Sequence, residues 1–451
     1  MTADLQKRFK ELAQGAGVFV GGKLATQNDL CALFTARAAA LYLRGSGRLA
    51  FLLPLAALTR GQFERLRSGS FLGGAVQWDE AWTMDDSVQP LFPVPSCAVF
   101  GRRRATSRPL PETVRAYSGA LPMRDAPESL VDRLTAEGKF AATEGAPKPT
   151  EAVFTGGSAY RKAFRQGATL VPRMLCLVER KALGRIGPDP SAPLVASRRN
   201  TQEKRPWKDL SGVENQVEAE FLHPVLLGES IAPFAVFNPV EGVVPVTYKG
   251  EALDAKAALD RGFDHLSGWL RKAEAMWNEH RSEGGDMTLQ ERWNYHNELG
   301  AQFPLAPLRV VYAASGTVPA ACVLRDSKAV IEHILYWAPA ASVGEARYLV
   351  AILNSETARE RIVKYQARGQ WGARHFDKVV FNLPIPRYDA KIKLHRDLAD
   401  AAAKAERVAA AVTLPEGVKF QRARALVRAA LKEAGVADSI DALVAALLDA
   451  A

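Results

Sequence analysis

The chain has 451 residues, 48% of them hydrophobic, and a formal net charge of +10. This length allows two or three domains with well-filled cores, and the positive charge suits a polyanionic partner. No apolar run reaches the ~18 residues of a membrane helix, and the charged N-terminus, MTADLQKRFKELAQ, lacks the apolar core of a secretory signal. The four cysteines form no CxxC pair, so they predict buried thiols in a reducing cytoplasm, with no disulfide and no metal site.

The N-terminal part of the chain predicts α/β structure. A helix is expected over residues 3–14, and TQNDLCALFTARAAALYLR predicts a second one, with Thr26 or Asn28 as its N-cap. The continuous apolar run GRLAFLLP predicts a strand that is covered on both faces. Two further strands, GAVQWDEAWTM and PSCAVFGRR, follow it. A strand such as GRLAFLLP is typical of the late part of a doubly wound sheet, yet here it begins close to Met1.

The rest of the chain predicts a second domain of a different kind. Residues 109–150 are rich in Pro, Ala and Glu and predict a connector. From residue 151 to about 390, short β-like runs such as TLVPRMLCLVER and LRVVYAASG indicate a mixed α+β domain. A helical pattern at about 253–297 forms an insert within this domain, and the alanine-rich residues 391–451 predict a helical tail.

The positive charge is concentrated in one window, residues 158–208. It holds twelve Lys or Arg against three Asp or Glu, an excess of nine that nearly equals the charge of the whole chain. Tyr160, Phe164 and Trp207 are interleaved with these charges, and such interleaving is typical of nucleic-acid surfaces. The window therefore predicts a nucleic-acid interface in preference to a solvated basic face, with Trp207 expected to be a packing anchor.

Three segments together resemble the N6-adenine DNA methyltransferases of the restriction-modification, type IIG-like group. The stretch LATQNDLCALFTARAAALYLRGSGRLAFLLPLAALTRGQFERLRSG resembles the second half of their catalytic domain. The stretch WDEAWTMDDSVQPLFPVPSCAVFGRR resembles the antiparallel hairpin that closes that domain. Three further stretches together resemble the end of their target-recognition domain. The first, YLVAILNSETA, predicts a small helix, and the last, HRDLADAAAKAE, predicts another helix. Between them, RGQWGARHFDKVVFNLPIPRYD contains in order a glycine turn, a lysine, a strand and the letters LPIP.

This resemblance implies an α/β fold in which an incomplete Rossmann-like methyltransferase half, residues 1–108, precedes a mixed α+β target-recognition domain, residues 151–390, with a helical insert and tail. It also implies double-stranded DNA as partner, S-adenosylmethionine as methyl donor, no metal, and a place in the bacterial cytoplasm with the nucleoid. Because the exocyclic amine of a base is inaccessible inside a duplex, such enzymes flip the base into a pocket. A separate basic domain holds the phosphates and reads bases in the major groove.

Two motifs of that family are absent. The sequence has no F-x-G-x-G turn to hold the donor, and it has no Pro-Pro pair, so the catalytic Asn/Asp-Pro-Pro-aromatic motif is missing. In the family this motif precedes a helix resembling MTADLQKRFKELA, so the missing strands are expected upstream of Met1. The chain is then half of a split enzyme, a truncated gene product, or a DNA-binding remnant. An exposed sheet edge is poorly stable alone, which favours a partner polypeptide that carries the N-terminal half.

The resemblance also indicates candidate residues in the first domain. Phe92 lies where the resembling enzymes place an aromatic ring that stacks on the flipped adenine, the alternative being a core phenylalanine that packs the hairpin. Arg102, Arg103 and Arg104 end the last strand of this domain. They are candidate phosphate ligands, the alternative being a solvated strand end.

Two groups of residues in the second domain are candidate DNA contacts. In the basic window, most contacts are expected to reach phosphates, and the candidates are Arg161, Lys162, Arg165, Arg198, Arg199, Lys204 and Arg205. In RGQWGARHFDK, two glycines allow a close backbone approach, the alternative being a structural turn that positions the last strand. The candidates there are Gln370, Trp371, Arg374 and Lys378, while His375 has no second His or Cys nearby to form a metal site.

Other chemistry is not indicated. Glu80, Asp85 and Asp86 are expected to cap and solvate a loop, no PD-(D/E)xK nuclease pattern is present, and GVFVGGKLA does not match the phosphate-binding loop. The function expected is the recognition and base-flipping part of a site-specific adenine-N6 methyltransferase, inactive without another polypeptide. The alternative is a non-catalytic specificity module that binds DNA for another effector. An RNA-binding protein is disfavoured because no RNA-binding module is recognised.

Overall fold

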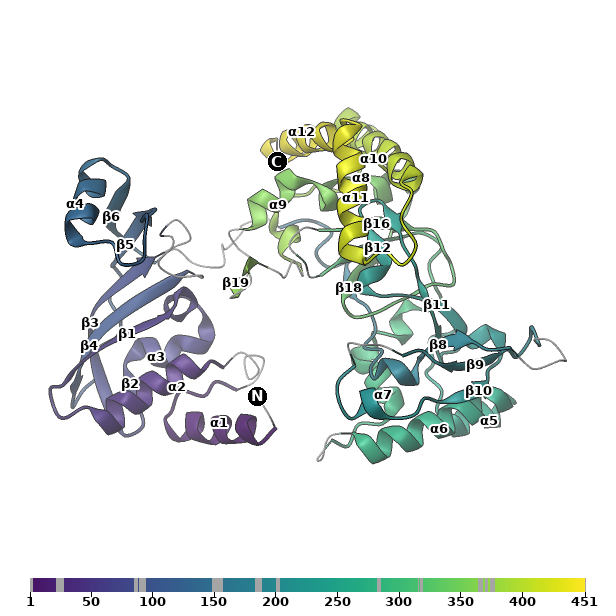
Figure 1. Ribbon diagram of the computed structural model, residues 1–451, viewed down its shortest axis with the longest axis horizontal. Helices are drawn as coiled ribbons and strands as arrows, with labels where there is room; N and C mark the ends of the chain where they lie inside the picture. The colour runs from purple at the N-terminus through teal and green to yellow at the C-terminus, as the bar shows by residue number, and fades with distance from the viewer. Residues whose placement is uncertain are drawn as a thin grey trace. The chain divides into compact units, whose positions relative to one another are not determined.

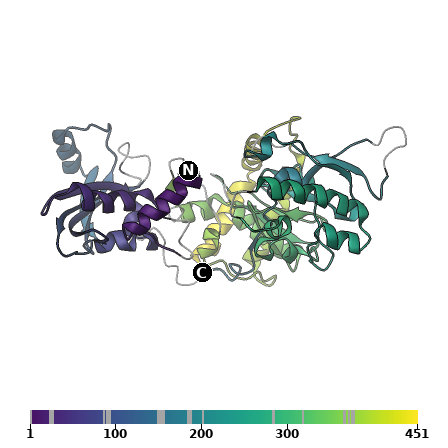
Figure 2. The ribbon, with the colours of Figure 1, turned by 90° about the horizontal axis from the view of Figure 1, so that it is seen from below.

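The chain forms two compact units. Unit 1 comprises Met1–Val153 with Tyr365–Arg374, and unit 2 comprises Phe154–Lys364 with His375–Ala451 (Figure 1). Unit 1 runs from purple to blue and unit 2 mainly from teal to yellow in Figure 2. The computed structural model describes residues 3–21, 28–84, 88, 95–147, 157–182, 189–199, 203–281, 285–314, 316, 319–363, 368–369, 372–373 and 378–450. Within these ranges, no helix has both the length and the apolar character needed to cross a membrane.

Unit 1 is built on a six-stranded sheet with the order β1-β4-β3-β5-β6, in which β2 pairs with β3. Only β3 and β5 are parallel; the other pairs are antiparallel. The strands are β1 (Arg48–Pro54), β2 (Ser70–Phe71), β3 (Gly74–Met84), β4 (Ser96–Arg104), β5 (Val114–Gly119) and β6 (Phe140–Gly145). The helices are α1 (Ala3–Gly15), α2 (Leu30–Arg37), α3 (Glu64–Ser68) and α4 (Glu128–Ala136), with a π-helical turn (Ala38–Tyr42) continuing α2.

The β3–β4 pair confirms the antiparallel hairpin that the sequence predicts. The two strands stay in register from Ala75 opposite Arg104 to Met84 opposite Ser96, with one irregularity near Asp79. Trp78 on β3 is fully buried, and its indole N–H donates to the carbonyl of Leu66 at 3.0 Å. This hydrogen bond satisfies the indole nitrogen, which is the only polar atom of the Trp78 side chain. Trp78 therefore joins α3 to the sheet without leaving a buried polar atom unpaired.

Three local predictions in unit 1 differ from the structure. The segment 109–150 is not a bare connector, because β5, α4 and β6 extend the first sheet. The strand GRLAFLLP alternates between buried and exposed residues, so it is covered on one face. The N-cap of α2 is Asp29, whose carboxylate accepts from the N–H of Cys31 at 2.9 Å. The Asn28 amide instead bonds to both backbone polar groups of Val20.

Unit 2 contains two larger sheets. The mixed six-stranded sheet has the order β10-β9-β8-β14-β11-β17, and the antiparallel four-stranded sheet has the order β16-β15-β18-β7. A two-stranded ribbon joins β12 and β13. The strands are β7 (Arg165–Gln166), β8 (Leu177–Arg180), β9 (Leu194–Ser197), β10 (Glu214–Gln216), β11 (Leu222–Leu226), β12 (Ile231–Ala232), β13 (Ala235–Val236), β14 (Val240–Val243), β15 (Arg309–Ala313), β16 (Ala321–Leu324), β17 (Val330–Ile331) and β18 (Leu335–Pro339).

The helices of unit 2 occur where the sequence predicts them. The insert contains α5 (Ala255–Asp260), α6 (Asp264–His280) and α7 (Leu289–Trp293), and the tail contains α10 (Lys393–Ala411), α11 (Phe420–Glu433) and α12 (Val436–Asp449). Between them lie α8 (Val343–Asn354) and α9 (Glu356–Val363). In the segment 365–374, which belongs to unit 1, two short strands, β19 (Arg368–Gly369) and β20 (Gly372–Ala373), pair antiparallel where the glycine turn is predicted. The strand predicted after that turn is instead a 3₁₀ turn, Val379–Asn382.

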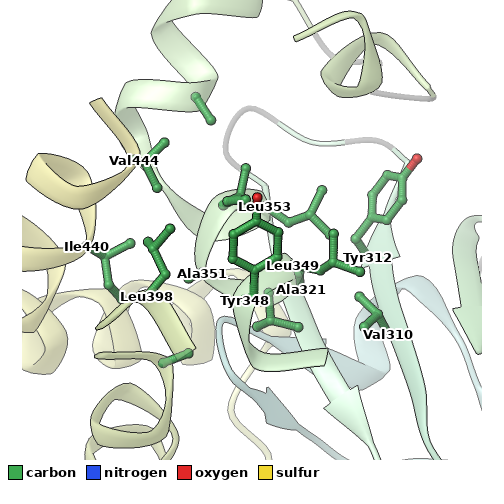
Figure 3. Close-up of a cluster of buried hydrophobic side chains, with 14 of the residues drawn as sticks. Val310, Tyr312, Ala321, Tyr348, Leu349, Ala351, Leu353, Leu398, Ile440 and Val444 are labelled. Carbon is green, nitrogen blue, oxygen red and sulfur yellow. The ribbon is translucent and has the colours of Figure 1, made fainter. Parts of the chain in front are cut away.

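Each sheet of unit 2 is covered by helices with one apolar face. The buried apolar residues of α6 follow the helical period and pack into the core beside the six-stranded sheet; they are Leu266, Trp269, Leu270 and Ala273. Helix α8 packs on β15 and β16, and α10 and α12 pack on α8 (Figure 3). The tail predicted as helical is therefore part of the unit 2 core, because Leu398 of α10 and Val444 of α12 are fully buried there.

Substituting Leu398 tests the role of the tail in that core. Leu398→Ala removes buried methyl groups that the close-packed neighbours cannot replace, so we expect unit 2 to lose about 2–5 kcal/mol of unfolding free energy. Lys404→Ala, on the exposed face of the same helix, is the control and should change stability by less than about 0.5 kcal/mol. Thermal unfolding followed by circular dichroism measures both. Equal transitions for the two variants would show that the tail is not integral to unit 2.

Candidate nucleic-acid interface

The loop 157–165 at the start of unit 2 is tightly bound to the segment that follows Lys378. The Ser158 N–H donates to the Phe381 carbonyl at 2.9 Å, and the Ser158 hydroxyl donates to the Ile385 carbonyl at 3.2 Å. Phe164 is fully buried and stacks on Phe381 with ring centroids 4.6 Å apart. These contacts join two parts of the chain that are more than 200 residues apart in the sequence.

Tyr160 provides a second anchor for the same loop. Its hydroxyl donates to the Glu345 carboxylate at 2.9 Å and accepts from the N–H of Tyr388 at 2.8 Å. Burial raises the pKa of this phenol well above its usual value. The prediction that Tyr160 and Phe164 are surface aromatics among the cations is wrong, since both side chains are core residues. Their burial leaves the intervening cations of the loop at the surface.

Three predicted cations converge at this place. Arg161 and Arg165 are exposed on the loop, and Lys378 precedes the 3₁₀ turn to which the loop is bound. Burial lowers the pKa of Lys378, and the neighbouring charges of Arg161 and Arg165 lower it further. The guanidinium of Arg161 donates to the side-chain oxygen of Asn382, which orients it. We call Arg161, Arg165 and Lys378 the cation cluster.

Among the described residues, the cation cluster has no carboxylate to neutralise it. In the part of the chain that the structure describes, no carboxylate lies within ion-pair distance of any of its three members. Other cations of the basic window are neutralised: Arg173 pairs with the buried Glu332 at 2.9 Å, and Arg180 pairs with Glu241 at 2.8 Å. Like charges held close together without a carboxylate favour an external anion.

The remaining candidates of the basic window lie elsewhere in unit 2. Arg198 and Arg199 are exposed just after β9 of the six-stranded sheet, and Lys204 and Arg205 are exposed in the next turn. Trp207 anchors this turn, as predicted, by stacking on Trp277 of α6 with centroids 5.8 Å apart. Arg205 pairs with Asp209 at 2.9 Å, an exposed ion pair that contributes little to stability. Lys162 is exposed beside Arg161.

The candidates in unit 1 have contacts within that unit. Arg102 pairs with Asp79 at 2.9 Å, and the guanidinium of Arg103 donates to the carbonyl of Leu43. Both arginines therefore have partners within unit 1, and their contact with phosphate stays a prediction. Glu80 accepts from the indole N–H of Trp82 at 2.7 Å. Phe92, Gln370, Trp371 and Arg374 lie outside the described residues, as do Asp85, Asp86 and His375.

Asn382 is the contributor to this surface that the sequence analysis missed. It lies in FNLPIP, where nothing local marks it, and it contacts Arg161 at a separation of 221 residues. Only an alignment that shows both positions changing together would have revealed the pair from sequence. Within the ranges that the structure describes, no group of three or more His, Cys, Asp or Glu side chains is arranged to hold a metal ion.

Comparisons with known proteins give only remote similarities. No family model matches the sequence, and no curated protein does. Among solved structures, the chain is similar to the type IIL restriction-modification enzyme MmeI in complex with DNA, with 12% identity and a TM-score of 0.48 over 97% of this chain and 52% of that one. It is also similar to the type IIG restriction endonuclease BpuSI, with 14% identity and a TM-score of 0.30 over 98% and 52%.

The chain thus spans about half the length of each of these restriction-modification enzymes. Identities and TM-scores this low support no conclusion about function. What this chain does is therefore inferred from its own residues.

The electrostatic coupling within the cation cluster can be measured directly. Arg161→Gln removes a like charge and should raise the pKa of Lys378 toward its ordinary value, whereas Arg198→Gln, outside the cluster, should not. The pH dependence of Lys378 acetylation, followed by mass spectrometry, reports this pKa. The pKa of Lys378 in the folded protein lies below 10.5, its ordinary value in the unfolded chain. At a pH between these two pKa values, the unfolded chain binds more protons than the folded protein. Lys378 therefore makes the free energy of unfolding rise with pH across that window. An unchanged Lys378 profile in Arg161→Gln would contradict the cluster.

Proposed function

We propose that this chain binds double-stranded DNA at a specific sequence and forms the recognition and base-flipping part of an S-adenosylmethionine-dependent adenine-N6 methyltransferase, in a restriction-modification or phage-defence system. The observation that carries the DNA-binding part is the cation cluster of unit 2. Its three cations lack a carboxylate partner among the described residues and are held by buried aromatic contacts. A row of phosphates supplies the negative charge that such a surface requires.

Within this proposal, the cation cluster positions the duplex and does not read its sequence. Arg and Lys contacts to phosphate set the register of a protein on DNA, and base edges in the grooves carry the sequence information. The exposed Lys162, Arg198, Arg199 and Lys204 would add phosphate contacts where the duplex continues along unit 2. Arg205 contributes less, because Asp209 already neutralises its charge.

Unit 1 supports the proposal of a partner polypeptide. Among the described residues, β1 pairs only with β4, so its other edge offers unpaired N–H and C=O groups. Apolar side chains are exposed on both β1 and α2, since 51% of Leu52 and 61% of Phe34 are accessible. An open strand edge and exposed apolar side chains within one unit are features that further strands and helices can cover. We propose that the polypeptide carrying the donor-binding and Pro-Pro motifs binds here.

In this proposal, the methyl donor is bound mainly by the polypeptide that carries the missing N-terminal half. S-adenosylmethionine needs a glycine turn that lets the backbone approach it, and the sequence has no F-x-G-x-G motif and no Pro-Pro pair. We therefore assign none of the residues of this chain to the donor. The chemistry of transfer belongs, in this proposal, to the partner polypeptide.

A salt titration tests the DNA-binding part. Lys378→Ala and Arg165→Ala should each weaken binding to duplexes of any sequence and reduce the slope of log affinity against log salt concentration by about 1, because each removes one phosphate contact. Fluorescence anisotropy with a labelled duplex of random sequence measures both quantities.

The matched control for this titration is Arg180→Ala. It removes the same charge, but Glu241 already neutralises Arg180 through two short hydrogen bonds. We expect its slope to equal that of the unmodified chain. If the cluster variants and Arg180→Ala lose affinity equally, the cluster is not a specific phosphate site and the net charge alone drives binding.

The catalytic part is tested by methyl transfer from labelled S-adenosylmethionine to DNA adenine. We expect no transfer by the purified chain alone, and transfer when the polypeptide with the two missing motifs is added. Phe34→Glu and Leu52→Glu should prevent this activation, because a charge in each apolar contact opposes association. Met123→Glu, at another exposed apolar position of unit 1, should not.

Transfer by the chain alone would contradict the need for a partner. The alternative, a non-catalytic specificity module, predicts that the added polypeptide gives no transfer and that S-adenosylmethionine analogues leave the DNA affinity unchanged.

A further inference from the structure

Two tight turns of unit 2 pack backbone to backbone at the edge of the helical insert. In the turn 247–251, the Thr247 N–H donates to the Glu251 carbonyl at 2.9 Å, and in the turn 294–300 the Gly300 N–H donates to the Asn294 side chain at 2.8 Å. A Cβ added at Gly250 would lie 2.6 Å from the Gly300 carbonyl oxygen. Only glycine allows this approach, so the two turns form one rigid unit, which we call the paired turns.

The paired turns hold backbone conformations that side chains disfavour. His296 and Asn297 both have positive φ angles, 52° and 61°. The left-handed region is uncommon for residues other than glycine, and two consecutive cases persist only where surrounding contacts hold them. Here the Glu298 N–H donates to the Tyr295 carbonyl at 3.0 Å and the Asn297 N–H to the Asn294 carbonyl at 2.8 Å. Strain of this kind is concentrated at functional sites.

The paired turns present aromatic rings to solvent. Tyr248, at the tip of the first turn, is 79% exposed, and Tyr295 in the second turn is 39% exposed. The ring of His296, also exposed, lies against that of Tyr295 with centroids 4.0 Å apart. Large rings at the tips of rigid turns lose little conformational entropy when they bind, which is the property of recognition residues.

A hollow of about 590 Å³ adjoins the rings of the second turn, Tyr295 and His296. Its lining includes Tyr295 and His296, the carboxylates of Asp286 and Glu291, and the amides of Gln290 and Asn294. Both amides already bond within the protein, Gln290 to Glu274 and Asn294 to Asn297, and the Glu291 carboxylate accepts from the Thr288 N–H at 2.7 Å. The carboxylate of Asp286 and the two rings are therefore the groups that face an incoming ligand.

The side chains that line the hollow are better suited to a base than to a phosphate group. None of the described residues that line it is Lys or Arg, so it is unsuited to a phosphate group. A carboxylate accepts hydrogen bonds from an exocyclic amine, and aromatic rings stack on the flat face of a base. These two features occur together in a nucleobase with an exocyclic amine, and the exocyclic amines that face the major groove of a duplex are those of adenine and cytosine.

We infer that the paired turns contact DNA bases, with Tyr248 and Tyr295 making apolar or stacking contacts and Asp286 accepting from an adenine or cytosine amine. This inference rests on the proposed DNA binding and assigns base readout to a part of unit 2 distinct from the cation cluster. The sequence analysis did not single out these residues. Their signal arises from glycines 50 positions apart, Gly250 and Gly300, that meet only in the folded protein.

The test is selection of bound duplexes from a library with a randomised centre, followed by affinity measurements on the selected duplex. Tyr248→Ala and Tyr295→Ala should each lower the affinity for that duplex roughly ten- to hundredfold, while the salt slope stays that of the unmodified chain. Asp286→Asn should change the preference at an adenine or cytosine position of the selected motif, because an amide presents a donor as well as an acceptor. Tyr295→Phe, which keeps the ring, should retain the affinity.

The outcomes separate this inference from the proposed function. If the unmodified chain binds no duplex and enriches no motif, both fail together. If it enriches a motif and Lys378→Ala reduces the salt slope, but the tyrosine and Asp286 variants match the unmodified chain, only the base contact is overturned. A reduced salt slope in Tyr248→Ala would also overturn it, by indicating a phosphate contact. Both tyrosines are at the surface, so thermal unfolding of the variants should be unchanged, and Tyr295→Phe distinguishes loss of the ring from loss of the fold.

Discussion

The stacking of Phe164 on Phe381 is the contact on which the candidate interface depends. The two rings are fully buried and 4.6 Å apart, and the hydrogen bonds of Ser158 and Tyr160 surround them. Burial of these two aromatic side chains supplies free energy that offsets the repulsion between the positive charges of the cation cluster. Without this anchor and the hydrogen bonds around it, the mutual repulsion of Arg161, Arg165 and Lys378 would favour their separation.

The pairing of charges within the fold explains why the cations of the basic window, residues 158–208, do not form one uniform surface. Arg173 is used inside unit 2, where it neutralises the fully buried Glu332, and Arg180 is neutralised by Glu241. A buried carboxylate without a partner is strongly unfavourable, so the cation that pairs with it is committed to the fold. The cations left over are the ones that an external polyanion can bind. Net charge therefore indicates the partner class, while ion pairing within the fold decides which residues serve it.

Unit 1 and unit 2 differ in how far their sheets and apolar side chains are covered. In unit 2, helices cover the four-stranded sheet, and the tail helices close its core (Figure 3). In unit 1, β1 lies at the end of the strand order with Leu52 exposed, and α2 leaves Phe34 exposed. Exposed apolar side chains beside an open strand edge are unusual in a protein that acts alone, and they support association through unit 1.

The sequence by itself determined the elements whose signal is local. The period of α6 and of the tail helices, the alternation of β3 and β4, and the excess of cations in residues 158–208 are all readable from neighbouring residues. It did not show that β5 and β6 extend the first sheet, that Val379–Asn382 forms a 3₁₀ turn, or that Tyr160 and Phe164 are buried. The sequence also did not show that Arg161 contacts Asn382 or that Gly250 packs against Gly300. These outcomes depend on contacts between distant parts of the chain, and only the tertiary structure decides which surfaces are buried and which charges remain unpaired.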